Sequence, residues 1–87
     1  MRLDKFLKLS RIIKRRPVAK TLADSGRIEV NGRVAKAGTA LAVDDVVTIT
    51  YGHRIIKLKV MTLSESTKKD DAKHMYHILE EIQKDRD

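Results

Sequence analysis

The sequence predicts an α+β protein in which two N-terminal helices pack on a small, mostly antiparallel sheet, with one more helix near the C-terminus. Three patterns lead to this prediction. Apolar residues recur at helical spacing towards both ends of the chain. Between them, β-branched and polar residues alternate, which is typical of half-buried strands. The pair Asn31-Gly32 separates two of these runs and favours a tight hairpin, because both central residues of a type I′ turn need a positive φ.

Two short helices are predicted in the first part of the chain. The packing stripe of the first occupies positions i, i+3, i+4 and i+7, which are Leu3, Phe6, Leu7 and Ser10. Pro17 is expected to begin the second helix, because its missing N–H would be unpaired there in any case. Gly26 is expected just after the end of this helix, in the left-handed conformation that glycine adopts without a steric penalty.

The middle of the chain predicts a sheet of three to five strands. The alternating segments are residues 27–30, 33–36, 46–51 and 54–61, with a second turn at Gly52-His53. After them, a stripe at i, i+3, i+7 and i+10 predicts a final helix through Ala72, Met75, Leu79 and Ile82. We expect Ser66 or Thr67 to cap this helix and residues 83–87 to fray.

The basic residues are concentrated in the first part of the chain. Residues 2–36 carry eleven lysines and arginines and three acidic residues, a net charge of +8, which exceeds the +7 of the whole protein. Such an excess indicates a polyanionic partner. Nucleic acid is favoured over a membrane surface, because membrane-binding helices carry aromatic residues and Leu on a wide apolar face. Phe6 is the only aromatic residue among the first fifty. RNA is the partner that we expect.

We expect these residues to form a surface that follows RNA phosphates, against the simpler interpretation of an ordinary solvated face. Three cations spaced by three share one face of the first helix, and the N-terminus of the second can bind phosphate through free N–H groups. Aromatic residues for base stacking are few, so recognition of shape and backbone is expected. The candidate RNA-contacting residues are Arg2, Lys5, Lys8, Arg11, Lys14, Arg15, Arg16, Lys20, Arg27, Asn31 and Lys36.

Catalytic and metal sites are not indicated. The chain has no cysteine, no Gly-Lys-Ser/Thr phosphate loop and no supported Ser/His/Asp set, and we expect no room for a pocket of about 300–1,000 Å³. No enzyme activity, cofactor or small-molecule substrate is therefore expected. His74 and His77, at i and i+3 of the predicted final helix, lack an obvious third metal ligand and are expected to face solvent.

A membrane or secreted location is not indicated either. The longest apolar run is Ala40–Val43, which is far too short to span a bilayer, and charges interrupt the N-terminal segment in a way that a secretory signal does not allow. The absence of cysteine suits a reducing compartment. We expect a cytoplasmic protein with no membrane partner.

Three motifs stand in the N-terminal half of the chain: Arg2-Leu3-Asp4-Lys5-Phe6-Leu7, Arg16-x-x-Ala19-x-x-Leu22 and Gly26-Arg27-Ile28-x-Val30-Asn31-Gly32. With Lys36 and Asp45-Val46-Val47, they resemble the S4 RNA-binding domain, a module named for a protein of the small ribosomal subunit, over about residues 2–51. Two positions depart from that family. It often has Ser or Thr where Arg16-Pro17 stands, and Gly where Asp44 stands.

Over nearly its whole length the chain is similar to the RqcP family, stand-alone S4-domain proteins related to heat shock protein 15. The similarity includes Ile12-x-Lys14-Arg15-Arg16 and Thr67-Lys68-Lys69. It implies an S4-type RNA-binding domain over residues 1–61 and a C-terminal extension with one helix over residues 62–87. From its length, we expect the chain not to be one of the fused catalytic relatives of this domain.

The resemblance also implies a function in bacterial ribosome-associated quality control. The family binds 23S rRNA and peptidyl-tRNA on the large ribosomal subunit after a stalled ribosome has split, and works with an RqcH-type factor while alanine tails are added. Arg2 and Arg16 match positions that the family uses for RNA contact. Two alternatives stay open: a generic heat-shock ribosome rescue factor, and a protein-interaction module whose basic face docks an acidic partner.

Overall fold

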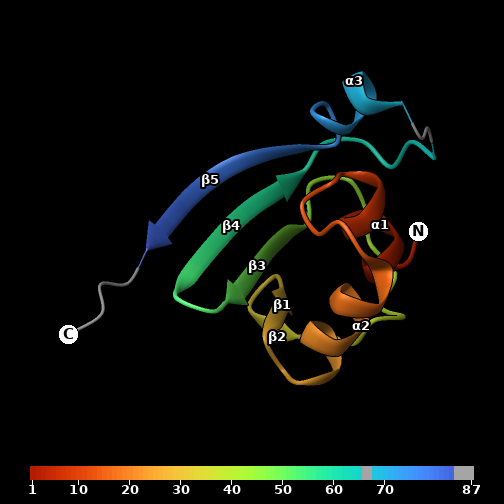
Figure 1. The fold of residues 1–87 in the computed structure, drawn as a ribbon. Helices are drawn as coiled ribbons and strands as arrows, with labels where there is room; N and C mark the ends of the chain where they lie inside the picture. The colour runs from red at the N-terminus through yellow and green to blue at the C-terminus, as the bar shows by residue number, and fades with distance from the viewer. Residues whose placement is uncertain (66–67, 84–87) are drawn as a thin grey trace.

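The computed structural model describes residues 1–65 and 68–83. In chain order the elements are α1 (Leu3–Leu9), α2 (Arg16–Asp24), β1 (Ile28–Val30), β2 (Arg33–Val34), β3 (Val46–Tyr51), β4 (Arg54–Val60), α3 (Lys69–Ala72) and β5 (Tyr76–Gln83). The strands form one antiparallel sheet in the order β2-β1-β3-β4-β5. Figure 1 shows α1 and α2 together against one side of this sheet, while β4 and β5 extend past them. The expected α+β class is confirmed.

The core lies between the two N-terminal helices and the face of the sheet that they cover. α1 contributes Leu3, Phe6 and Leu7, which are fully buried, as the stripe predicted. Ser10 is buried with them, and its hydroxyl donates a hydrogen bond to the Leu7 carbonyl oxygen at 3.2 Å, so this polar group is satisfied. α2 contributes Ala19 and Ala23, and the sheet contributes Ile28, Val47, Ile49, Leu58 and Val60.

The turns that position α2 and β1 depend on positive φ angles. Gly26 follows α2 with φ 82°, and Asn31 and Gly32 have φ 52° and 82°, so the predicted helix end and the predicted hairpin are both confirmed. Asp44 has φ 77° at the position where the S4 domain often has glycine. The turn before β3 therefore keeps a left-handed residue, at a steric cost that glycine would avoid.

The predicted helix through Ile82 is wrong. Only Lys69–Ala72 are helical, and residues 76–83 form β5, antiparallel to β4. A register shift opposite Lys57 and Leu58 leaves Leu79 as an extra residue, which interrupts the two-residue alternation. This bulge gave the apolar residues their helix-like spacing. Of the predicted stripe, Met75 is buried, whereas Leu79 is 47% exposed.

The outer edge of β4 explains why residues 76–83 form a strand and not the predicted helix. Without β5, the outer backbone groups of β4 would be unpaired, and pairing Val60 with Tyr76 and Arg54 with Gln83 satisfies the strand along its length. The predicted caps at residues 66–67 lie outside the described residues, and so do residues 84–87 of the segment 83–87 that was expected to fray. Its first residue, Gln83, pairs with Arg54 at the end of β5.

Candidate nucleic-acid interface

Asp4, a residue outside the predicted set, is the centre of the basic cluster. Its side chain is only 4% exposed and accepts hydrogen bonds from two arginines. Arg2 Nε lies 3.1 Å from Oδ1 and Arg16 Nε lies 3.2 Å from Oδ2, while the Lys5 backbone N–H donates to Oδ1 at 2.9 Å. The arginine side chains remain 54% and 46% exposed. One buried carboxylate thus holds two guanidinium groups in fixed positions at the surface.

This arrangement also determines the protonation of Asp4. Burial alone would raise its pKa, but the hydrogen bonds from Arg16 and Arg2 outweigh burial and hold the pKa below its ordinary value of 3.8. Asp4 is therefore ionised throughout the physiological pH range, and the two arginines keep their partner.

The lowered pKa predicts how stability changes with pH. The contribution of Asp4 is fully present above 3.8, its pKa in the unfolded chain, and is lost as the pH falls through the lower pKa of the folded protein. We expect the free energy of unfolding to fall more steeply below about pH 4 in the wild type than in Asp4→Asn. Urea unfolding followed by circular dichroism at several pH values measures this difference. Parallel acid slopes for the two proteins would contradict it.

The loop after β2, which begins near Lys36, packs its backbone against this cluster. The backbone N–H groups of Leu3 and Asp4 donate to the carbonyl oxygens of Thr39 and Ala37 at 2.8 and 3.1 Å. The Arg2 guanidinium lies over Gly38, about where a side chain at that position would touch it. These N–H groups belong to the first turn of α1 and are already bonded, so in α1 the exposed side chains, not the helix end, are available to an anion.

The segment after β4 also reaches the basic cluster. Lys5 Nζ lies 2.6 Å from Glu65 Oε1, and this ammonium lowers the pKa of the Glu65 carboxyl. Both side chains are partly or largely exposed, so the pair contributes little to stability. An RNA phosphate that approached Lys5 would compete with Glu65 for the same ammonium.

Lys14 and Arg15 lie in the connection between α1 and α2, where they line a groove of about 320 Å³ together with Arg54 of β4. The expectation that the chain has no room for a hollow of this size is therefore wrong. Sequence reasoning missed Arg54, although its place directly after a predicted turn and two residues before Ile56 put it on the inner face of the sheet.

Lys8 and Arg11 stand at the end of α1, and both are exposed. Arg11 has φ 62°, a conformation that costs a residue with a side chain about 1–2 kcal/mol and that glycine adopts freely. Non-glycine residues held in this way are found preferentially at functional sites. The conformation makes Arg11 a position where charge and folding can be separated by mutation.

Arg11→Gly is expected to leave the protein as stable as the wild type, or more stable by up to about 1 kcal/mol, because glycine relieves the strain. Removal of one phosphate contact should weaken RNA binding and reduce the salt slope by about one. Fluorescence anisotropy with labelled RNA and thermal unfolding measure the two effects. Arg11→Asn, which also tolerates this conformation, is the matched variant, and unchanged affinity in both would remove Arg11 from the interface.

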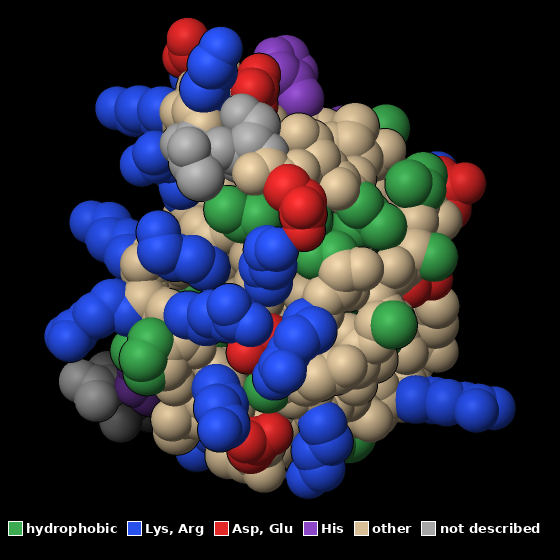
Figure 2. Space-filling model, turned by 90° about the vertical axis from the view of Figure 1, so that its right-hand side faces the viewer, with side chains coloured by type: hydrophobic (Ala, Val, Ile, Leu, Met, Phe, Trp, Pro, Cys, Tyr) green, Lys and Arg blue, Asp and Glu red, His purple; other side chains and the backbone are tan. Residues whose placement is uncertain are grey.

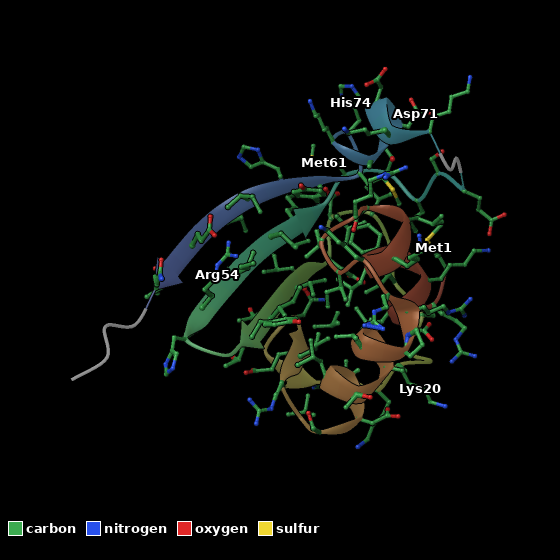
Figure 3. The ribbon with its side chains drawn as sticks, in the orientation of Figure 1. Met1, Lys20, Arg54, Met61, Asp71 and His74 are labelled. Atoms are coloured by element: carbon green, nitrogen blue, oxygen red, sulfur yellow. The ribbon has the colours of Figure 1, made fainter. Side chains whose placement is uncertain are left out.

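The remaining candidates are placed further away. Lys20 projects from α2 away from the sheet (Figure 3). Arg27 follows α2, and its carbonyl oxygen accepts a hydrogen bond from the Thr50 N–H, whereas Asn31 lies at the other end of β1. The Asn31 amide donates to Asp45 and accepts from the Val46 N–H, at 3.0 and 2.9 Å, so its side chain is committed to the turn.

The face formed by α1 and α2 gathers lysine and arginine side chains, with few acidic groups between them. Figure 2 shows this face with blue side chains across its centre and left side and acidic atoms enclosed among them. The structure directly joins Arg2, Lys5 and Arg16 through Asp4, and places Lys14 and Arg15 along one groove. The two helices and their connection thus carry one basic surface, whereas the Asn31 side chain is held in the turn before β2.

The residues considered for metal binding do not share a helix. His74 follows α3, and His77 lies on β5, so the assumed helical spacing does not apply (Figure 3 labels His74 beside Asp71). Within residues 1–65 and 68–83, no three His, Cys, Asp or Glu side chains come close enough to hold a metal ion. In the same ranges, no helix has the length and apolar character needed to cross a membrane.

Comparison with known proteins points to RNA. The family model of the S4 domain matches residues 1–47. The chain is 57% identical to the RQC P-site tRNA stabilizing factor of Streptococcus pneumoniae, over 93% of this chain and 92% of that protein, and 49% identical to the protein of the same name from Bacillus subtilis, over 93% and 94%. Among solved structures, trimeric heat shock protein 15 of Vibrio cholerae superposes with a TM-score of 0.82 at 25% identity, over 90% of this chain and 80% of that one.

Proposed function

Because the chain belongs to the S4 domain family, in the branch of the RQC P-site tRNA stabilizing factors, we propose that it is a non-enzymatic RNA-binding adaptor of ribosome-associated quality control. It binds 23S rRNA and peptidyl-tRNA on the split large ribosomal subunit and supports alanine tailing by an RqcH-type factor. The observation that carries this proposal is the pair of exposed guanidinium groups that Asp4 holds in place.

The mechanism requires binding and no chemistry. Arg2 and Arg16 point donors into solvent from a rigid support, and a guanidinium can bind a phosphate through two parallel hydrogen bonds. Lys5 and Lys20 add charge on the two helices, and Lys14 and Arg15 add charge in the connection between them. Two RNA molecules that both contact this surface would be held together, which is how the protein would keep a tRNA in place.

The division of the chain fits this proposal. Residues 1–61 supply the basic helices and the first four strands, and residues 62–83 supply α3 and β5. The second part contributes Met75 to the core and pairs along the whole of β4. We assign residues 1–61 to the RNA-binding domain and residues 62–87 to an extension that stabilises it. The location that follows is the cytoplasm, on ribosomes.

Salt dependence tests this function most directly. If about four phosphates are contacted, the logarithm of the affinity for structured RNA should fall with the logarithm of the salt concentration with a slope of roughly −3 to −4. Co-sedimentation with large subunits that carry peptidyl-tRNA should follow the same slope. A flat dependence would contradict a phosphate-dominated surface, and a partner that stays bound after RNase treatment would favour an acidic protein instead.

A further inference from the structure

Tyr51 lies where the helix layer stops covering the sheet. Along β3, Val47, Ile49 and Tyr51 point to the same face, since side chains alternate along a strand. The first two are buried beneath α1 and α2, but Tyr51 is 48% exposed. An aromatic side chain exposed beside a basic surface is a feature of proteins that bind unpaired bases.

Hollows lie on both sides of this tyrosine. On one side is the groove of about 320 Å³, in which Ile12 and Ile56 form an apolar wall and Lys14, Arg15 and Arg54 form the rim. On the other side, Tyr51 lines a shallow apolar hollow with Pro17 and Leu22 of α2. The groove is at the small end of the range of about 300–1,000 Å³ for small-molecule sites, which suits a single nucleotide.

The charges around the groove favour an anionic occupant. Lys14, Arg15 and Arg54 face it, and the acidic group at its edge is Glu81, which forms an ion pair with Arg54. Figure 3 shows Arg54 on β4, with β5 beside it. An apolar wall and an exposed aromatic ring suit the flat base of a nucleotide, and a cationic rim suits its phosphate.

We propose that Tyr51 stacks against one unpaired base of the bound RNA, whose phosphates contact Lys14 and Arg15. This inference rests on the proposed RNA-binding function and adds to it a preference for RNA with an extruded nucleotide. The cluster around Asp4 then binds the backbone of the paired region, and the groove distinguishes a bulged or looped RNA from a continuous helix.

The test compares two labelled RNA hairpins that differ at one position, a bulged adenosine in one and an abasic residue in the other. Wild-type protein should bind the bulged hairpin more tightly, and Tyr51→Ala should lose roughly five- to a hundredfold of that affinity, the range for one stacked base. Tyr51→Phe, which keeps the ring, should restore it. The abasic hairpin should bind all three proteins equally, and thermal unfolding checks that each is folded.

A spectroscopic measurement separates stacking from a structural effect. The chain has two tyrosines and no tryptophan, so in Tyr76→Phe the intrinsic fluorescence comes from Tyr51 alone. The bulged hairpin should quench this fluorescence and the abasic hairpin should not. Equal quenching of the Tyr51 fluorescence by the two hairpins would overturn the inference. Equal affinity of the wild type and Tyr51→Ala for the bulged hairpin would overturn it as well, also where gel filtration shows that the substitution has changed the elution of the protein.

Arg16→Gln shows which proposal has failed. If Arg16→Gln weakens binding of both hairpins while Tyr51→Ala weakens neither, the basic surface binds RNA and the base site is rejected. If Arg16→Gln leaves both affinities unchanged, Arg16 is removed from the interface, and if the wild type binds neither hairpin, the proposed function is rejected, and the base site with it.

Discussion

Arg16→Glu is expected to abolish co-sedimentation of the protein with large ribosomal subunits. The wild-type guanidinium is fixed by Asp4 at 3.2 Å and half exposed, so a phosphate meets a donor that is already in place. Glutamate at this position repels phosphate, and we expect the affinity to fall by roughly a hundredfold. Quantitative sedimentation of purified subunits with increasing protein measures the loss.

Two further variants make this result specific. Arg33→Glu changes the net charge by the same amount on β2, outside the candidate surface, and should reduce binding only slightly. The carboxylate that Arg16→Glu introduces would also face the buried Asp4 carboxylate, so thermal unfolding must show that the variant is folded. Arg16→Gln avoids that repulsion and should still lose roughly tenfold, the range of one charge-assisted hydrogen bond. An equal loss of affinity in Arg16→Glu and Arg33→Glu would mean that net charge alone determines binding to the subunit.

Asp4→Asn is expected to weaken both folding and RNA binding. Loss of the charged acceptor of two arginines should lower the free energy of unfolding by about 2 kcal/mol and the melting temperature by roughly 10 °C. The variant loses a negative charge, so the net charge rises from +7 to +8. A surface that bound RNA by total charge would therefore bind more tightly, whereas a surface that depends on the positions of Arg2 and Arg16 should bind several-fold less tightly.

Glu65→Gln is the matched control for this prediction. It also removes one carboxylate that accepts a hydrogen bond from the basic surface, but Glu65 is exposed and its partner is the flexible Lys5. Release of this ammonium should strengthen RNA binding. Anisotropy titrations of both variants below their melting temperatures distinguish the two effects. Tighter binding by Asp4→Asn as well would show that Asp4 does not act by positioning the arginines.

Much of the fold follows from local patterns in the sequence. The buried stripe of Leu3, Phe6 and Leu7, the left-handed Gly26 and the hairpin at Asn31-Gly32 each depend on residues close together in the chain, and each was predictable. The C-terminal strand was not, because its formation depends on a distant partner. Residues 76–83 become a strand when β4 offers an unpaired edge, and the bulge at Leu79 hides the alternation that would have indicated it.

The candidate site was predictable in its charge but not in its organisation. Clustered cations predicted which residues would face an anion, and the structure gathers the guanidinium groups of Arg2 and Arg16 around Asp4. The organising group is Asp4, which was not among the predicted residues. Its partner Arg16 is twelve residues away, and no spacing rule reveals that distance. Arg54 could have been found, because its spacing from Ile56 places it on the inner face of the sheet, where it lines the groove.

The two edges of the sheet bear on how the protein behaves at high concentration. An edge strand can pair with a strand of another molecule, and long, flat edges are the ones that aggregate. One edge here, β2, has only two residues, while the other, β5, is bent by its bulge and carries Glu80 and Glu81. Pairing between the edge strands of neighbouring molecules is therefore disfavoured at both edges of the sheet, although Ile78, Leu79 and Ile82 are exposed along β5.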